Sequence, residues 1–263
     1  MVNLRGDPGP EETVGIVLAG GSSTRLQQEG APVPGGKIWL PVAGRPLLEI
    51  VCARLALELA ELIVVAAPGQ ELPPLPEGVT VIADTRPGAG PLAALADGMR
   101  AALAVGRGGG RPPVRQALVA SADVPLVSPA VIRLLCGALV PLVAGEPAAE
   151  APLWAVPLVA GHPQVLLSTL SLQALPDIEA YLATGRRDPR GLLEALRART
   201  PQAVRIVAET DLLAVDPGLE SFLDVDTWDD FLKVCEKPLP SAPGFRAGDR
   251  RSAAKADLRE KGG

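Results

Sequence analysis

The chain has 263 residues, of which 48% are hydrophobic and only 3% aromatic, and its formal net charge is −5. Its length and composition fit one large α/β domain or two small ones, with a core of Leu, Val and Ala. They exclude a polymeric nucleic acid as an expected partner, because backbone binding needs a positive field and strand stacking needs aromatic platforms. A small anionic ligand stays possible, since a few local basic groups are enough to bind it.

The chain shows no pattern typical of secretion or membrane insertion. Its first residues lack a basic start followed by a long apolar run, so we expect no signal peptide. The longest stretch without Asp, Glu, Lys or Arg, 151–176, is long enough to span a bilayer. Pro152, Pro157 and Pro163 interrupt it, which indicates buried strands and turns instead. We therefore expect a cytoplasmic protein with no membrane partner.

The cysteines fit the same compartment. Cys52, Cys136 and Cys235 are far apart and show no CxxC spacing. This distribution predicts buried reduced thiols, with no disulfide framework and no zinc site.

Short apolar runs alternate with amphipathic segments in the first half of the chain. The apolar runs are short enough for buried strands, and the other segments carry helix-start signals such as Pro46, Pro91 and Ser128-Pro129. The predicted strands are 14–18, 62–66, 79–83 and 116–121, and the predicted helices are 46–59, 91–105 and 128–139. Strand-then-helix repeats of this kind indicate a three-layer α/β fold, with a mainly parallel sheet and helices on both faces.

The second half is less regular, and both ends of the chain lose the apolar pattern. We predict strands at 153–159, 164–167, 203–207 and 222–225, and helices at 176–182, 189–199 and 227–235. Residues 1–12 are rich in Pro, Gly and acids and 237–263 are polar, so we expect a flexible N-terminus and a disordered tail. A single domain is predicted over 13–236.

A glycine-rich segment directly follows the first predicted strand. It comprises Leu18, Ala19, Gly20, Gly21, Ser22, Ser23, Thr24 and Arg25. Glycines let the backbone approach a ligand, successive N–H groups form an anion nest, and Arg25 adds a planar cation suited to phosphate. Neither a Walker A loop nor a G-x-G-x-x-G pattern is present. On these residues alone, a nucleotide-binding loop and a plain tight turn are about equally good interpretations.

The order of several further segments resembles the MobA-like nucleotidyltransferase family. The glycine-rich loop is followed by Lys37 and by segments at 44–48, 90–95, 121–126 and 222–227, which match the family's motifs in sequence order. The resemblance covers about 13–236. It implies the Rossmann-like nucleotidyltransferase fold and Mg²⁺-dependent transfer of a nucleoside monophosphate from a nucleoside triphosphate to a phosphorylated acceptor. The chain departs from the family at Leu26-Gln27, at Gly36 and in a longer loop before Lys37.

The resemblance, together with the chemistry, selects candidates for the reacting phosphates. Nucleotidyl transfer needs neutralised phosphate charge and a metal, with little covalent help from the protein. Arg25 and Lys37 are the basic candidates. Asp123 follows a strand among apolar residues and is the first metal candidate, because Mg²⁺ accepts one or two carboxylates plus substrate oxygens. Asp224 and Asp226 alternate on a predicted strand and would complete the metal site. A helix-capping or turn role is the alternative for each aspartate.

The remaining candidates concern the nucleoside and the acceptor. Asp84, with Gly90, Pro91 and Leu92, is expected to bind the base or ribose, although a turn role suits Asp84 equally. The resemblance places His162 on the acceptor side, where an ordinary turn histidine is the alternative. The candidates for an acceptor phosphate cluster near a helix start, where a solvated charged face explains them as well. They are Arg186, Arg187 and Arg190.

The motifs that carry the resemblance do not agree on whether the nucleotide is GTP or CTP. Leu-Ala-Gly-Gly at 18–21 and Gly-Pro-Leu-Ala at 90–93 are typical of guanylyltransferases that attach GMP to molybdopterin, which favours GTP. Gly161-His162-Pro163 is common in molybdopterin cytidylyltransferases, and 37–41 with 126–129 resemble cytidylyltransferases of isoprenoid synthesis. Sugar-phosphate nucleotidyltransferases share the fold. A nucleotide-binding regulatory module that kept the fold is the non-enzyme alternative.

Overall fold

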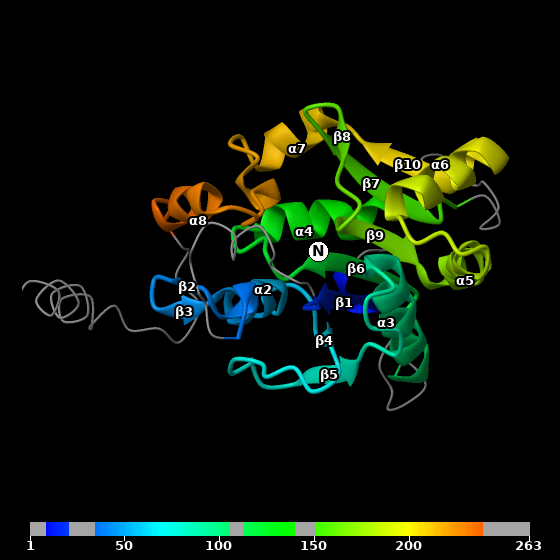
Figure 1. Cartoon of the computed structure of the whole chain (residues 1–263). Helices are drawn as coiled ribbons and strands as arrows, with labels where there is room; N and C mark the ends of the chain where they lie inside the picture. The colour runs from blue at the N-terminus through cyan, green and yellow to red at the C-terminus, as the bar shows by residue number, and fades with distance from the viewer. Residues whose placement is uncertain (1–8, 21–34, 106–112, 140–150, 239–263) are drawn as a thin grey trace, which may run out of the picture.

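The computed structural model describes residues 9–20, 35–105, 113–139 and 151–238. Their centre is an eight-stranded sheet in the order β10-β7-β9-β6-β1-β4-β5, with the short strand β8 paired to β7 (Figure 1). The strands are β1 Thr13–Leu18, β4 Glu61–Ala66, β5 Val79–Ala83, β6 Gln116–Ser121, β7 Trp154–Val159, β8 His162–Pro163, β9 Leu167–Ser171 and β10 Val204–Val207. All strands of the main path are parallel except β9, which runs antiparallel to β6 and β7.

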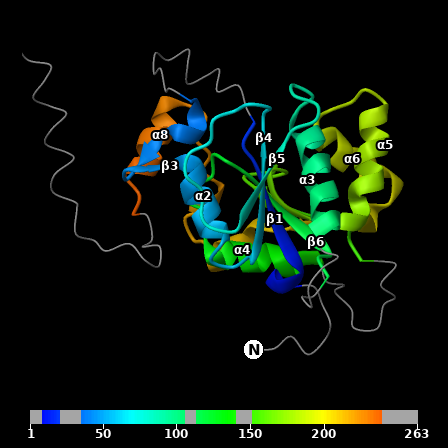
Figure 2. The same cartoon turned by 90° about the horizontal axis from the view of Figure 1, so that it is seen from below.

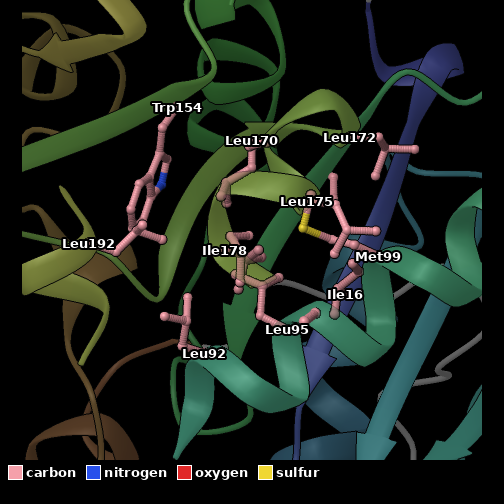
Figure 3. Packing of buried hydrophobic residues seen from close by; sticks show 14 of the residues in the cluster. Ile16, Leu92, Leu95, Met99, Trp154, Leu170, Leu172, Leu175, Ile178 and Leu192 are labelled. Atoms are coloured by element: carbon pink, nitrogen blue, oxygen red, sulfur yellow. The ribbon is translucent and has the colours of Figure 1, made fainter. Parts of the chain in front are cut away.

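Helices cover both faces of this sheet, as the sequence pattern predicted (Figures 1 and 2). The helices are α2 Leu47–Leu55, α3 Pro91–Val105, α4 Pro129–Cys136, α5 Leu175–Ala183, α6 Pro189–Arg199, α7 Glu209–Val215 and α8 Trp228–Cys235. One core cluster joins α3, α5 and α6 to the sheet (Figure 3), and a second joins α2, α4 and α7 to its other face. The predicted three-layer α/β class is confirmed.

Alternation along the strands explains how one sheet supplies two cores. In β1, Ile16 belongs to the cluster under α3, and the next residue, Val17, belongs to the cluster under α2 and α4. Successive side chains on a strand point to opposite faces, so a strand buried on both faces must be apolar throughout. Every residue of β1 is buried.

A third, smaller cluster lies beside the main sheet. The hairpin of β2 Pro41–Val42 and β3 Arg45–Pro46 packs with α8 through Val42, Phe231 and Val234. Leu126 and Val225 belong to the same cluster, which ties the segment after β6 to the segment before α8. This cluster therefore fixes two loops that carry candidate site residues.

Several predicted boundaries need correction. Residues 165–166 lie in a turn closed by the Leu167 N–H on the Gln164 carbonyl at 3.3 Å, and the strand begins only at Leu167. The strand predicted at 222–225 is wrong, because Glu220–Phe222 is a 3-10 helix whose first N–H groups the buried Asp216 carboxylate accepts. Helix α2 ends at Leu55 instead of continuing to 59, and α7 was not predicted.

Pro10–Glu12 forms a 3-10 helix directly before β1, at the end of the segment expected to be flexible. The expected tail lies outside the described residues from 239 onward. Among the described helices, none combines the length and the apolar character needed to cross a bilayer.

Candidate active site

The strand order has a switch point between β1 and β6. The chain leaves β1 for β4 and β5 on one side, and β6 lies on the other side of β1. Ligands of open α/β sheets bind beyond the carboxyl ends of the strands at such a point. The Leu18 carbonyl accepts a hydrogen bond from the Ala122 N–H at 3.1 Å, so the chain after β1 and the chain after β6 leave the sheet side by side.

The described start of the glycine-rich loop offers only backbone to a ligand. Leu18 and Ala19 are buried in the two main cores, and Gly20 is exposed. The sequence did not single out Gln70, whose side-chain amide donates to the Ala19 carbonyl at 3.2 Å and whose oxygen accepts from the Ala67 N–H at 2.9 Å. Gln70 thus orients the exit of β1, in a role that no sequence pattern reveals.

The rest of the predicted phosphate loop lies outside the described residues. These positions are Gly21, Ser22, Ser23, Thr24 and Arg25. Their assignment to the triphosphate stays a prediction.

Lys37 joins two of the predicted metal carboxylates. Its Nζ lies 2.7 Å from Asp123 Oδ2 and 2.7 Å from Asp226 Oδ1. The side chains of Lys37 and Asp123 are each 15% exposed, whereas that of Asp226 is 41% exposed. Three residues proposed from separate motifs therefore meet at one place.

Local backbone contacts bring these motifs together. The Val225 N–H donates to the Asp123 carbonyl at 3.0 Å, so the segment 224–226 runs beside the end of β6 without belonging to the sheet. We predicted that a strand would orient Asp224 and Asp226. In the structure this backbone hydrogen bond holds their segment instead. Thr227 and Asp230 form a capping box that starts α8 directly after Asp226.

A buried arginine supports the other side of the site. Arg54 Nη2 donates to the Leu126 carbonyl at 3.0 Å, and Arg54 Nε donates to the Val127 carbonyl. Burial lowers the pKa of Arg54, and the charge of Asp216 opposes this effect. Because Arg54 belongs to α2, these bonds hold the loop that follows Asp123 against the second core. No pattern in the sequence predicted this contact.

The carboxylates around Lys37 perturb one another. Burial lowers the pKa of Lys37, but the charge and hydrogen bond of Asp123, followed by those of Asp226, outweigh burial and raise it above its usual value. Partial burial, followed by the charges of Asp226 and Asp123, raises the pKa of Asp224. Asp224 therefore lies close enough to share the field of the other two carboxylates.

One oxygen of this group is suited to a metal ion. Asp123 Oδ1 is buried and has no hydrogen-bond partner among the described residues. A buried carboxylate oxygen is costly to leave unpaired, so it fits a cation that arrives with a ligand. No group of three His, Cys, Asp or Glu within the described ranges is arranged to hold a metal by itself. Mg²⁺ needs only one or two protein carboxylates and draws its other ligands from water and phosphates, so the buried Asp123 Oδ1 is chemically suited to such an ion.

The predicted nucleoside residues lie at the ends of β5 and α3. Asp84 Oδ1 accepts a hydrogen bond from the Arg86 N–H at 2.8 Å, which is a turn contact and leaves its other oxygen for a ligand. Gly90 has φ +87° immediately before α3, a conformation that favours glycine. Pro91 starts α3, and the Leu92 side chain is buried in the core, so only the backbone of Leu92 can face a nucleotide.

The predicted acceptor residues surround the same edge of the sheet. A Cβ at Gly90 would lie 3.7 Å from Arg187 Cβ, so Arg187 packs against the turn before α3. The Arg186 guanidinium lies 4.8 Å from the ring centroid of Tyr181. Arg186, Arg187 and Arg190 are all exposed. The structure therefore gives Arg187 a place beside the nucleoside segment and gives Arg186 a cation–π contact of its own.

His162 is exposed in β8, where it pairs with Val159 at the carboxyl end of β7. Strands β7 and β6 are separated only by β9. Adjacent strands are about 4.8 Å apart, which puts β7 about 10 Å from β6. His162 and Asp123 thus lie at the same edge of the sheet, at the ends of two strands that β9 separates.

Replacement of Asp224 by Asn should stabilise the ligand-free protein at pH 7. The native state raises the pKa of this carboxyl, so its charged form opposes folding above that pKa. Because Asp224 is exposed and solvent screens it, we expect a gain below about 1 kcal/mol. Urea denaturation from pH 7 to pH 4 should show the gain shrinking as the pH falls through the raised pKa.

The neighbouring variant Asp229→Asn is the matched control. Asp229 is exposed in the first turn of α8, where the helix dipole favours a negative charge, so its loss should cost a few tenths of a kcal/mol. Destabilisation by Asp224→Asn at pH 7 would contradict the electrostatic description of this cluster.

Comparison with known proteins identifies relatives in one family. The model of the MobA-like NTP transferase domain matches residues 15–211. A relative from Mycobacterium avium named "probable molybdenum cofactor guanylyltransferase" is 35% identical over 189 residues, which is 72% of this chain and 84% of the relative. Asp224 and Asp226 lie beyond the matched domain range, and the structure brings Asp226 to Lys37 beside Asp123.

Solved structures share the fold at lower identity. Molybdopterin-guanine dinucleotide biosynthesis protein A from Archaeoglobus fulgidus has a TM-score of 0.61 at 21% identity, over 85% of this chain and 97% of that chain. A 4-diphosphocytidyl-2C-methyl-D-erythritol synthase from Anaerococcus prevotii has a TM-score of 0.52 at 13% identity, over 85% and 94%. With the family match and the sequence relative, the chain belongs to the MobA-like NTP transferase family and is a nucleotidyltransferase.

Proposed function

We propose that this enzyme transfers GMP from GTP to a phosphorylated small-molecule acceptor, molybdopterin, and releases pyrophosphate in a Mg²⁺-dependent reaction. The name of the Mycobacterium avium relative supports the choice of acceptor and nucleotide. The Leu-Ala-Gly-Gly and Gly-Pro-Leu-Ala segments at 18–21 and 90–93 favour GTP.

The arrangement of Lys37, Asp123 and Asp226 carries this proposal. It lies at the switch point of a mainly parallel sheet, directly beside the exit of β1 into the glycine-rich loop. Asp123 Oδ1, which is buried and has no hydrogen-bond partner in the part of the chain that the structure describes, supplies a ligand for Mg²⁺, and Asp224 and Asp226 add carboxylates within the same field. A cation beside the phosphate loop is what transfer at an α-phosphate requires.

The residues divide the reaction between charge neutralisation and positioning. The backbone of 18–24, Arg25 and Lys37 are assigned to the triphosphate, whose negative charge they neutralise. When bound, Mg²⁺ withdraws charge from the phosphate oxygens. An acceptor phosphate oxygen attacks the α-phosphorus in line with the leaving group, so one P–O bond forms as the bond to pyrophosphate breaks. Positioning of the two substrates is therefore the main task of the protein.

The other predicted residues receive substrate roles within the proposal. Asp84 and the turn at Gly90 are assigned to the base or ribose. His162, Arg186 and Arg187 are assigned to the acceptor, because they lie on exposed segments at the β7 and α6 side of the sheet. The packing of Arg187 against the turn at Gly90 supports these roles, because group transfer needs the two substrates side by side.

A second candidate is transfer of CMP from CTP. Gly161-His162-Pro163, a segment common in molybdopterin cytidylyltransferases, favours it, and in the structure this segment includes strand β8 at the carboxyl end of β7. Cytidylyl and guanylyl transfer need the same metal and phosphate groups, so the nucleotide base alone separates these candidates.

Thermal unfolding with a panel of nucleoside triphosphates tests the nucleotide. At a ligand concentration of 100 times Kd, binding stabilises a protein by about 2.7 kcal/mol, which raises Tm by about 5–10 °C for a domain of this size. We expect this shift for GTP with Mg²⁺, and a smaller shift for GTP with a chelator. A selective shift with CTP would support the second candidate. No shift with any triphosphate would contradict the assignment of a nucleotide site.

A further inference from the structure

The position of Lys37 differs from the role that the reaction assigns to it. For catalysis the ammonium belongs on the triphosphate, yet in the structure Nζ lies within 2.7 Å of both Asp123 Oδ2 and Asp226 Oδ1. These are the carboxylates proposed to hold Mg²⁺. A positive charge on the protein itself thus stands where a metal cation is expected.

We propose that Lys37 occupies the cation position in the ligand-free protein and leaves it for the triphosphate, so that the divalent cation binds with the nucleotide and not before it. This inference rests on the proposed function. It adds an order of binding and a second role for Lys37, as an internal cation that keeps the carboxylates together.

Charge and reach both support the exchange. Asp123, Asp224 and Asp226 share one field, and the ammonium reduces the negative charge that would otherwise attract a free cation. The lysine side chain is a flexible four-carbon stem with a point charge. It can turn from carboxylates to phosphates while the start of its 3-10 helix, Lys37–Trp39, stays in place. A triphosphate offers more negative charge than the two carboxylates and supplies the missing metal ligands as well.

The unpartnered Asp123 Oδ1 offers an alternative that the test must separate. A cation could bind this oxygen while Lys37 remains on Oδ2. In that case a free cation would bind the wild-type protein readily, and its binding would shift the Lys37 Nζ resonance in the absence of nucleotide. If Lys37 excludes the cation, its removal must strengthen binding of the free metal.

Titration with Mn²⁺ in the absence of nucleotide, followed by electron paramagnetic resonance of the free ion, measures this competition. We expect Lys37→Met to bind Mn²⁺ at least tenfold more tightly than the wild type, because one positive charge a few ångströms from the ion is removed. Lys37→Arg, which keeps the charge, should stay close to wild type. Equal affinity of Lys37→Met and wild type would overturn the proposal.

Lys233→Met is the matched control. Lys233 is 63% exposed and pairs with Asp230 at the start of α8. The substitution Lys233→Met therefore removes the same charge from a position near the same carboxylates. Solvent screens such a pair, and we expect less than a threefold change in Mn²⁺ affinity. A gain equal to that of Lys37→Met would show a general charge effect and contradict the specific role of Lys37.

A measurement on the wild type covers the case in which Lys37→Met does not fold. The lysines of the chain are Lys37, Lys233, Lys237, Lys255 and Lys261. With ¹⁵N-labelled lysine, the Nζ resonance of Lys37 can be assigned by comparison with Lys37→Arg. It should stay in place when Mg²⁺ is added alone and shift when Mg²⁺ and a non-hydrolysable GTP analogue are added together. A shift with Mg²⁺ alone would overturn the proposal.

The two proposals fail differently in these experiments. If the analogue with Mg²⁺ still raises Tm but Lys37 does not exclude free Mn²⁺, only the order of binding is wrong. If the analogue neither raises Tm nor moves the Lys37 resonance, the proposed nucleotide site fails as well.

Discussion

Replacement of Asp123 by Asn should lower kcat for nucleotidyl transfer by about a thousandfold or more. The amide keeps the shape of the side chain but removes the charge that we assign to Mg²⁺, and a missing metal ligand directly affects stabilisation of the reacting phosphates. It also takes away one of the two carboxylates that Lys37 contacts at 2.7 Å. Pyrophosphate release with saturating GTP, Mg²⁺ and acceptor measures the effect.

The control for this variant is Asp211→Asn, which makes the same chemical change at an exposed position of α7. It should keep activity within about twofold of wild type, since surface substitutions of this kind have small effects. Circular dichroism should show that both variants are folded. Activity of Asp123→Asn near the wild-type level would remove Asp123 from the metal site.

Replacement of Trp154 by Ala should have the largest effect on stability, about 3–5 kcal/mol. Trp154 in β7 is fully buried, and its indole N–H donates to Ser168 Oγ of β9 at 2.9 Å. Figure 3 shows its ring beside Leu192 of α6 and near Leu170, so it fills the space where the helix packs on the sheet. The lost side chain leaves a cavity, and Ser168 loses its donor.

Chemical denaturation measures this loss against a total stability of about 5–15 kcal/mol for a typical domain. Trp154→Phe keeps most of the apolar volume and should cost clearly less than Trp154→Ala. Trp228→Ala, at a tryptophan that is 38% exposed and contacts the Phe231 ring, should cost less than about 1.5 kcal/mol. A cost for Trp154→Ala no greater than that for Trp228→Ala would contradict the description of the core.

The fold was predictable where a single local signal decides the element. The parallel strands are short, mostly apolar runs, and β5 and β6 were predicted at their observed bounds, although β5 lies at the sheet edge and is partly exposed. Helix α6 was also predicted at its observed bounds, and the structure shows Asp188 capping it and Pro189 starting it. Alternation of such strands with helices was enough to predict the three layers.

The errors occurred where side-chain contacts, rather than the apolar pattern, decide the backbone. Residues 222–225 are apolar enough for a strand, but the buried Asp216 carboxylate binds the N–H groups of Glu220 and Ser221 and imposes a 3-10 turn. Gly98 is a similar case inside α3. A Cβ at Gly98 would lie 2.6 Å from Ile16 Cγ2, so this glycine lets the helix approach β1. From the sequence alone, a glycine inside a helix indicates only a position that weakens the helix.

The candidate site was predictable in its members but not in its contacts. Motif order selected Lys37, Asp123 and Asp226, and the structure brings these three together. Their ion pairs depend on the third core cluster and on the Val225 contact with Asp123, which join segments far apart in the sequence. The supporting roles of Arg54 and Gln70 depend on backbone carbonyls, which carry no sequence signal.

Transfer of label from [α-³²P]GTP to molybdopterin, with Mg²⁺ and purified protein, tests the central claim most directly. The proposed function predicts a labelled guanylyl product with equimolar pyrophosphate for the wild type, and neither product for Asp123→Asn. Transfer from CTP but not GTP would contradict the assigned nucleotide. No transfer to molybdopterin from either triphosphate, by protein that is folded and binds GTP with Mg²⁺, would contradict the assigned reaction.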